Sequence, residues 1–225
     1  MFFLLLPWQT RWIAEDTLVY GAASEFGRIS VYGFEVVLMA LLGMALFGIE
    51  RSRWRRWWED KRRRWMMGAM AVVVVLGLIS TAWAVEPHVA IQGWVRLLLA
   101  MGLFAALTTD DEISIDVVMA SLAIGLILPS LFGWLQMVHQ NVTASTALGM
   151  AAQDPSTLGT AVIEWANGRW LRAYGTFSHP NVFGGFLAFG LVSIAASVGR
   201  ARLKHVDLLL WLAAAMTGGA MVMTA

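Results

Sequence analysis

The stretch that decides the fold is RAYGTFSHPN, residues 172–181, which runs directly into the apolar residues VFGGFLAFG at 182–190. A polar loop ends here and a helix begins, because proline suits the first helical position, where its missing N–H would have no partner anyway. We therefore expect Pro180 to start a membrane helix. The backbone N–H groups from Asn181 onward then lie at a helix N-terminus, which carries partial positive charge.

Two arginines precede this helix start, Arg172 and Arg169. A helix N-terminus beside a guanidinium is an anion site suited to phosphate or pyrophosphate. The pattern also fits a simpler arrangement, a helix cap with an interfacial arginine whose head group extends to water. His179 fits a cap or loop residue, and it also fits contact with a pyrophosphate or proton transfer.

The motif Arg-x-x-Gly-Thr-Phe-x-His-Pro-Asn, followed by Phe-Gly-Gly-Phe-Leu, resembles the signature of the O-antigen ligase and polymerase family of bacterial membrane glycosyltransferases. The segments LPWQTRW at 6–12 and SVYGFE at 30–35 also look like that family's N-terminal region. The resemblance is specific at Arg172–Phe186 and covers the front part of the family's usual chain. We therefore expect a fragment of a longer protein that is inactive alone, with a Ser-Arg type motif and a second outer loop lying past Ala225.

The resemblance implies transfer of a glycan from a polyprenyl-pyrophosphate donor to a sugar hydroxyl of a glycan or lipid acceptor, at the outer face of the bacterial inner membrane. Charge that develops on the leaving pyrophosphate needs cationic stabilisation. We expect Arg172 and His179 to be catalytic, and Arg169, Pro180 and Asn181 to bind substrate. The donor is already activated, so we expect no nucleotide, metal or other cofactor. Ligation to a lipid core, to a protein or to another repeat unit all fit this chemistry.

Composition places the chain in a membrane. It has 59% hydrophobic and 14% charged residues, and its mean hydropathy is +0.67, whereas about a quarter of the residues in a soluble domain are charged. We expect an all-α, polytopic helix bundle that forms a single membrane-embedded domain over residues 1–225. Cysteine is absent, which excludes disulfides, thiol catalysis and thiolate metal sites.

About six apolar runs approach the length of about 20 residues that a membrane span needs. They are residues 29–49, 66–85, 89–107, 115–138, 181–198 and 206–225. Pro129 predicts a kink, and residues 157–165 predict an amphipathic surface helix. The loop at 51–65 is rich in arginine and tryptophan, a mix that fits binding of nucleic acid or of anionic lipid headgroups. A short arginine-rich loop between two spans is more typical of the cytoplasmic side of a membrane, and we favour that interpretation. By alternation, the long loop at 139–180 then faces the outer side of the membrane, periplasmic or extracellular.

Three polar residues fall inside expected spans. Glu35 and Arg96 should each lie about 10 Å below the outer interface, and Gln92 precedes Arg96 by one helical turn. A buried charge in a bilayer is costly unless it is paired or faces water. These residues therefore either line an outward-facing cavity, where they bind substrate and Arg96 helps to hold a phosphate, or pair with one another.

The cavity interpretation also supports a different function, a transporter or lipid-handling protein with a polar path lined by Glu35 and Arg96. A non-catalytic membrane subunit is a third possibility. Small residues in the span that follows Pro180 predict either close helix packing or room for a polyprenyl chain; they are Gly184, Gly185, Ala188 and Gly190. The histidines on the expected outer side match no compact metal motif.

Overall fold

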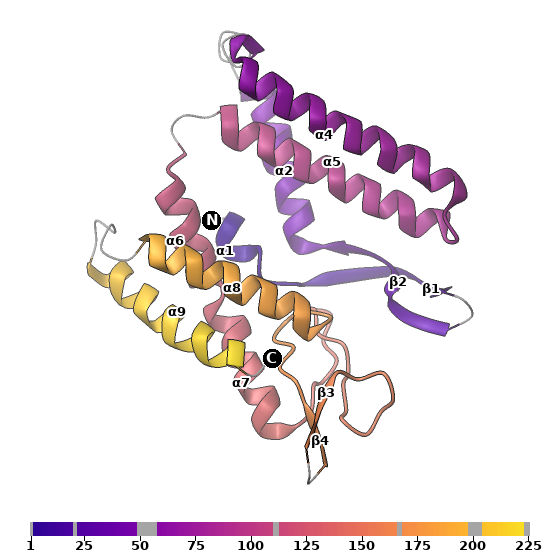
Figure 1. The fold of residues 1–225 in the computed structure, drawn as a ribbon, viewed down its shortest axis with the longest axis vertical. Coiled ribbons are helices and arrows are strands. Elements are labelled where there is room, and N and C mark those ends of the chain that lie inside the picture. The colour runs from indigo at the N-terminus through magenta and orange to yellow at the C-terminus, as the bar shows by residue number, and fades with distance from the viewer. Residues whose placement is uncertain are drawn as a thin grey trace. The chain divides into compact units, whose positions relative to one another are not determined.

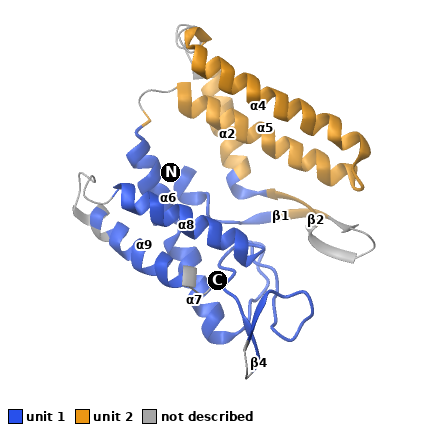
Figure 2. Ribbon diagram, in the orientation of Figure 1, with its two compact units in different colours: residues 1–11, 32–34, 114–225 blue, residues 12–31, 35–113 orange. Residues whose placement is uncertain are grey.

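The computed structural model describes residues 2–19, 22–48, 58–109, 113–165, 168–197 and 204–222. The chain forms two compact units, which Figure 2 shows in blue and orange. Unit 1 comprises Met1–Arg11, Tyr32–Phe34 and Ser114–Ala225, and unit 2 comprises Trp12–Val31 and Glu35–Ile113. A single membrane-embedded domain over the whole chain stays a prediction.

In the described part of the chain, four candidate spans are long and apolar enough to cross a bilayer, and they indicate a membrane-embedded protein. Unit 2 contributes α4 (Lys61–Ser80), which continues into the 3-10 turn η1 (Thr81–Trp83), and α5 (Pro87–Thr109). Unit 1 contributes α6 (Ile115–Gly125) with α7 (Ile127–His139) as one candidate span, and α8 (Pro180–Ser197) (Figure 1). These four match expected spans.

The other two expected spans are shorter apolar helices. The helix α2 (Gly33–Gly48) has 16 residues, and α9 (Lys204–Val222) contains the apolar stretch Leu209–Ala220. The expected helix start at residue 29 is wrong, because residues 29–32 belong to a strand. An apolar run does not by itself distinguish a strand from a helix.

Two strand pairs correct the expectation that the fold is entirely helical. The strand β1 (Arg11–Val19) pairs with β2 (Ala22–Tyr32), and β3 (Val162–Trp165) pairs with the antiparallel β4 (Gly168–Leu171). The second pair takes the place of the surface helix expected at 157–165. Ile163 and Trp170 face each other across it and are exposed, whereas Leu171 is buried. This alternation is that of a strand with one covered face.

The expected span that contains Pro129 is interrupted between α6 and α7, close to the carbonyl that this proline leaves without a bond. A proline lacks the N–H that would bond the carbonyl four residues earlier, and its ring clashes with that carbonyl. The carbonyl belongs to Gly125, where α6 ends, and α7 begins at Ile127 after the single residue Leu126. The helix is therefore interrupted within one turn before Pro129, and the predicted kink itself stays a prediction.

The core of unit 1 lies along α8. Its buried residues recur every three or four positions, as one face of a helix does, and include Phe183, Leu187, Gly190 and Ile194. Phe183 and Leu187 pack with Ala173 and Phe177 of the preceding loop. The polar loop is therefore anchored in the core through its own apolar side chains.

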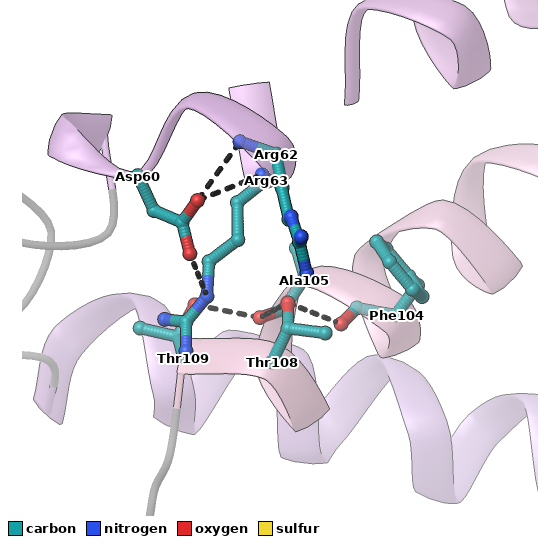
Figure 3. Close-up of polar contacts among 7 residues, drawn as sticks. All are labelled: Asp60, Arg62, Arg63, Phe104, Ala105, Thr108 and Thr109. Atoms are coloured by element: carbon teal, nitrogen blue, oxygen red, sulfur yellow. Dashed lines mark hydrogen bonds and ion pairs between the residues drawn. The ribbon is translucent and has the colours of Figure 1, made fainter. Parts of the chain in front are cut away.

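In unit 2, local hydrogen bonds complete two helix ends (Figure 3). The Asp60 carboxylate accepts the N–H of Arg62 at 2.8 Å and lies 3.4 Å from Nε of Arg63, so it caps α4. The hydroxyls of Thr108 and Thr109 donate to carbonyls one turn earlier in α5. Of the expected basic loop at 51–65, residues 51–57 lie outside the described residues, and 61–65 form the start of α4 instead.

A glycine substitution tests how α1 (Phe2–Leu5) packs on α6. A Cβ at Gly125 would collide with the backbone carbonyl of Leu4, so Gly125→Ala should lower the free energy of unfolding by roughly 1–3 kcal/mol. Thermal unfolding in detergent measures the change. The matched control is Gly185→Ala in α8, where an added Cβ meets no atom within 4 Å. Equal melting temperatures for the two variants would contradict this packing.

Candidate functional site

The loop at 172–179 is a buried structural element that joins β4 to α8. Ala173, Tyr174, Thr176 and Phe177 are all buried, and the Thr176 hydroxyl donates to the Pro7 carbonyl at 2.9 Å. Gly175 has a φ of 60°, and a Cβ there would lie 2.9 Å from the Phe183 ring. Glycine alone accepts both conditions without strain. The turn is thus fixed by its backbone and by its core contacts.

Arg172 lies against the start of α8. Its Nη2 donates to Oδ1 of Asn181 at 3.1 Å, and the arginine side chain is half-buried. Asn181 is the second residue of α8, which begins at Pro180. The structure therefore brings together the arginine and the helix start that the sequence singled out. A neutral amide orients a guanidinium without cancelling its charge.

The first turn of α8 is capped, as in the simpler of the two arrangements that fit the sequence. The Asn181 N–H donates to Nδ1 of His179 at 3.1 Å, and the N–H groups of Val182 and Phe183 donate to the His179 carbonyl at 3.1 and 3.2 Å. Pro180 has no N–H and is buried, which restricts it to starting the helix. His179 is a cap residue: its Nδ1 accepts the Asn181 N–H, which leaves the Nε2 side of the ring for other partners.

An apolar cavity of about 440 Å³ adjoins the polar pair. Its lining consists of Leu6, Leu122, Asn181, Val182, Gly185, Phe186 and Phe189. Asn181 therefore belongs both to the cavity wall and to the pair with Arg172. The small residues of α8 serve two purposes: Gly190 packs closely against Leu126, whereas Gly185 leaves open space.

Arg169 makes its polar contacts on the hairpin. Its Nε lies 3.8 Å from Oε1 of Glu164, directly across the strand pair, and its Nη1 is 3.5 Å from the Ser156 carbonyl. Among the described residues these are its polar contacts, and neither is with Arg172 or Asn181. Arg169 therefore lies on β4, and none of its polar contacts among the described residues involves the start of α8.

Glu35, Arg96 and Gln92 form their own cluster in unit 2. Nε of Arg96 lies 2.6 Å from Oε1 of Glu35, which is 6% exposed, and Nη2 of Arg96 donates to the Ser30 carbonyl at 3.0 Å. Gln92 donates to the same carbonyl. Of the two sequence-based interpretations, the structure contains the ion pair, and it joins α5 to the strand and helix that precede it.

Sequence reasoning missed two glutamines near the end of α7. Oε1 of Gln136 accepts the N–H groups of Tyr174 at 3.0 Å and Gly175 at 2.8 Å, and its Nε2 donates to the Gly175 carbonyl at 2.7 Å. Oε1 of Gln140 accepts the Leu171 N–H at 2.7 Å. The available signal was an amide side chain within an apolar span, where polar residues are rare and functional.

The phenol of Tyr174, which belongs to this loop, stays neutral. Burial raises the pKa of Tyr174 above its usual 10.0, although the Ala161 N–H bonded to its oxygen and the charge of Arg172 act in the opposite direction. A neutral phenol adds no negative charge next to Arg172.

The chain matches no protein-family model, no curated protein and no solved structure. A functional interpretation therefore depends on the residues and geometry of the site.

The pair in unit 2 gives a stability prediction. Replacing Arg96 by methionine leaves the buried Glu35 carboxylate without the guanidinium that faces it, and loss of one partner from a buried pair costs about 3–5 kcal/mol. Because Arg96 is 38% exposed, we expect a smaller loss, roughly 1–3 kcal/mol, measured by chemical unfolding in detergent. The double variant Glu35→Leu with Arg96→Met should regain most of that stability. A double variant no more stable than Arg96→Met alone would contradict the pairing.

Proposed function

We propose that this chain is part of a membrane glycosyltransferase of the O-antigen ligase and polymerase type. In this proposal it transfers a glycan from polyprenyl pyrophosphate to an acceptor sugar hydroxyl at the outer face of the bacterial inner membrane. The observation that supports it best is the double role of Asn181, which bonds Arg172 and also lines an apolar cavity. A lipid diphosphate has the matching two parts, an anionic head and a hydrocarbon chain.

The proposed reaction exchanges one bond at the sugar. The bond between the anomeric carbon and the pyrophosphate oxygen breaks, and its electron pair leaves with the pyrophosphate. The acceptor oxygen forms the new glycosidic bond, and its proton passes to a general base. Arg172 suits the leaving group because a guanidinium presents a fixed fork of donors to phosphate oxygens.

His179 has a secondary part in this proposal. Its Nδ1 is occupied by the Asn181 N–H, so the ring offers the opposite Nε2–H as a donor to the diphosphate. Its geometry supports a donor better than a base. Arg169 is held by Glu164 and Ser156, and we propose no direct substrate contact for it.

The transport alternative has less support. It requires Glu35 and Arg96 to line a polar path, whereas in unit 2 the two side chains bond each other and Arg96 also donates to the Ser30 carbonyl. Breaking that arrangement to bind a passing solute would expose a buried carboxylate to an apolar environment.

Substitution of Arg172 in the intact protein tests the proposed function. Arg172→Ala removes the cation that stabilises the leaving diphosphate, and loss of such a donor typically costs about 10²–10³ in rate. Arg172→Lys keeps the charge without the planar fork, so we expect intermediate activity. The measurement is glycan transfer from a polyprenyl-pyrophosphate donor in reconstituted membranes.

Arg169→Ala is the matched control for this experiment. It removes an arginine only three residues away whose polar contacts are with Ser156 and Glu164, and we expect it to retain most of the activity. Full activity of Arg172→Ala, with the protein correctly inserted, would overturn the proposed function.

A further inference from the structure

We propose that Gln136 and Gln140 are positioning residues that fix the backbone of the Arg172 loop and so hold its guanidinium ready for a diphosphate. This inference rests on the proposed function and assigns two residues to it that lie outside the family-like motif. Gln136 lies in the last turn of α7, and Gln140 caps the C-terminus of that helix, directly after His139. They lie 32 and more positions upstream of the loop in sequence, and only the fold brings them to it.

The glutamines bond the loop on both sides of Arg172. Gln140 accepts the N–H of Leu171, immediately before the arginine, at 2.7 Å. Gln136 accepts the N–H groups of Tyr174 and Gly175, just after it, and donates to the Gly175 carbonyl at 2.7 Å. Four backbone groups that flank Arg172 are thus held by the side chains of Gln136 in α7 and Gln140 at its C-terminal cap.

These bonds have no ready substitute. Gln136 is 6% exposed and the loop residues that it bonds are buried, so water does not replace its amide at low cost. Gln140 has a φ of 52°, the one positive φ at a non-glycine position in the described part of the chain. A glutamine in this left-handed conformation is strained. Its bonds to the Leu171 N–H and the Met137 carbonyl, both 2.7 Å, offset that strain.

Fixing the loop matters because Arg172 has a single role in the proposed reaction and a long, flexible side chain. A donor that is already oriented loses less freedom when the ligand binds, and small displacements of a reacting partner reduce rates strongly. The backbone on either side of Arg172 sets where the side chain starts. The glutamines therefore act through Arg172 and need no contact with the ligand.

A double-mutant cycle on the intact, detergent-purified protein tests this inference with farnesyl diphosphate as the probe. Gln136→Leu keeps the size of the side chain and removes its three bonds to the loop. We expect roughly tenfold weaker binding, the effect of a coupling of ordinary size between neighbouring residues. In an Arg172→Ala background, the same substitution should change the affinity by less than about twofold, because the group that it positions is gone.

Three further variants separate positioning from folding. Gln140→Gly suits the left-handed backbone and removes the bond to Leu171, so it should fold normally and still weaken binding. Gln136→Glu keeps the acceptor oxygen for both N–H groups and should bind better than Gln136→Leu. The control Gln153→Leu removes a part-buried glutamine of the same unit whose Oε1 accepts from Thr160, and it should bind like the unaltered protein.

Hydrogen exchange supplies a readout that does not depend on the ligand. The amides of Tyr174 and Gly175 should exchange faster in Gln136→Leu than in the unaltered protein, while amides in α8 keep their protection. Unchanged exchange, or equal loss of affinity with and without Arg172, would overturn the inference and leave the proposed function standing. If Arg172→Ala alone leaves the affinity unchanged, the proposed function falls and the positioning role falls with it.

Discussion

Unit 1 depends on how a buried loop backbone satisfies its hydrogen bonds. Residues 173–177 are buried among helices, and a buried N–H without a partner costs about 1–3 kcal/mol. No strand continues through this turn, so side chains from α7 provide partners, Gln136 above all. The same bonds that let the loop enter the core also determine where Arg172 leaves it. Stability and the geometry of the candidate site therefore have one origin.

The two arginine contacts that the sequence singled out differ in their chemistry. In unit 2, Arg96 forms an ion pair with the Glu35 carboxylate, so the two opposite charges compensate each other. In unit 1, the partner of Arg172 at the helix start is the neutral amide of Asn181, beside an apolar cavity. The helix start is the stronger candidate for an anionic lipid because its arginine contact adjoins an apolar cavity.

The sequence predicted those features that depend on neighbouring residues. Pro180 starts α8, Pro129 accompanies a helix interruption, and four apolar runs are helices of spanning length. The sequence did not predict the features that depend on contacts between segments far apart in the chain. The strand β3 forms because β4 pairs with it, and the glutamines of α7 matter because a loop more than 30 residues later returns to them. The cap on α8 was foreseen only as one alternative, since the direction of the His179 ring depends on the folded turn.

The most direct test of this account is an experimental structure of the intact protein with a polyprenyl diphosphate bound. The account predicts the diphosphate within hydrogen-bond distance of the Arg172 guanidinium, with the hydrocarbon chain along the cavity wall of Leu6, Val182 and Phe186. A diphosphate bound elsewhere, with Arg172 still joined to Asn181 and the cavity empty of the chain, would contradict it.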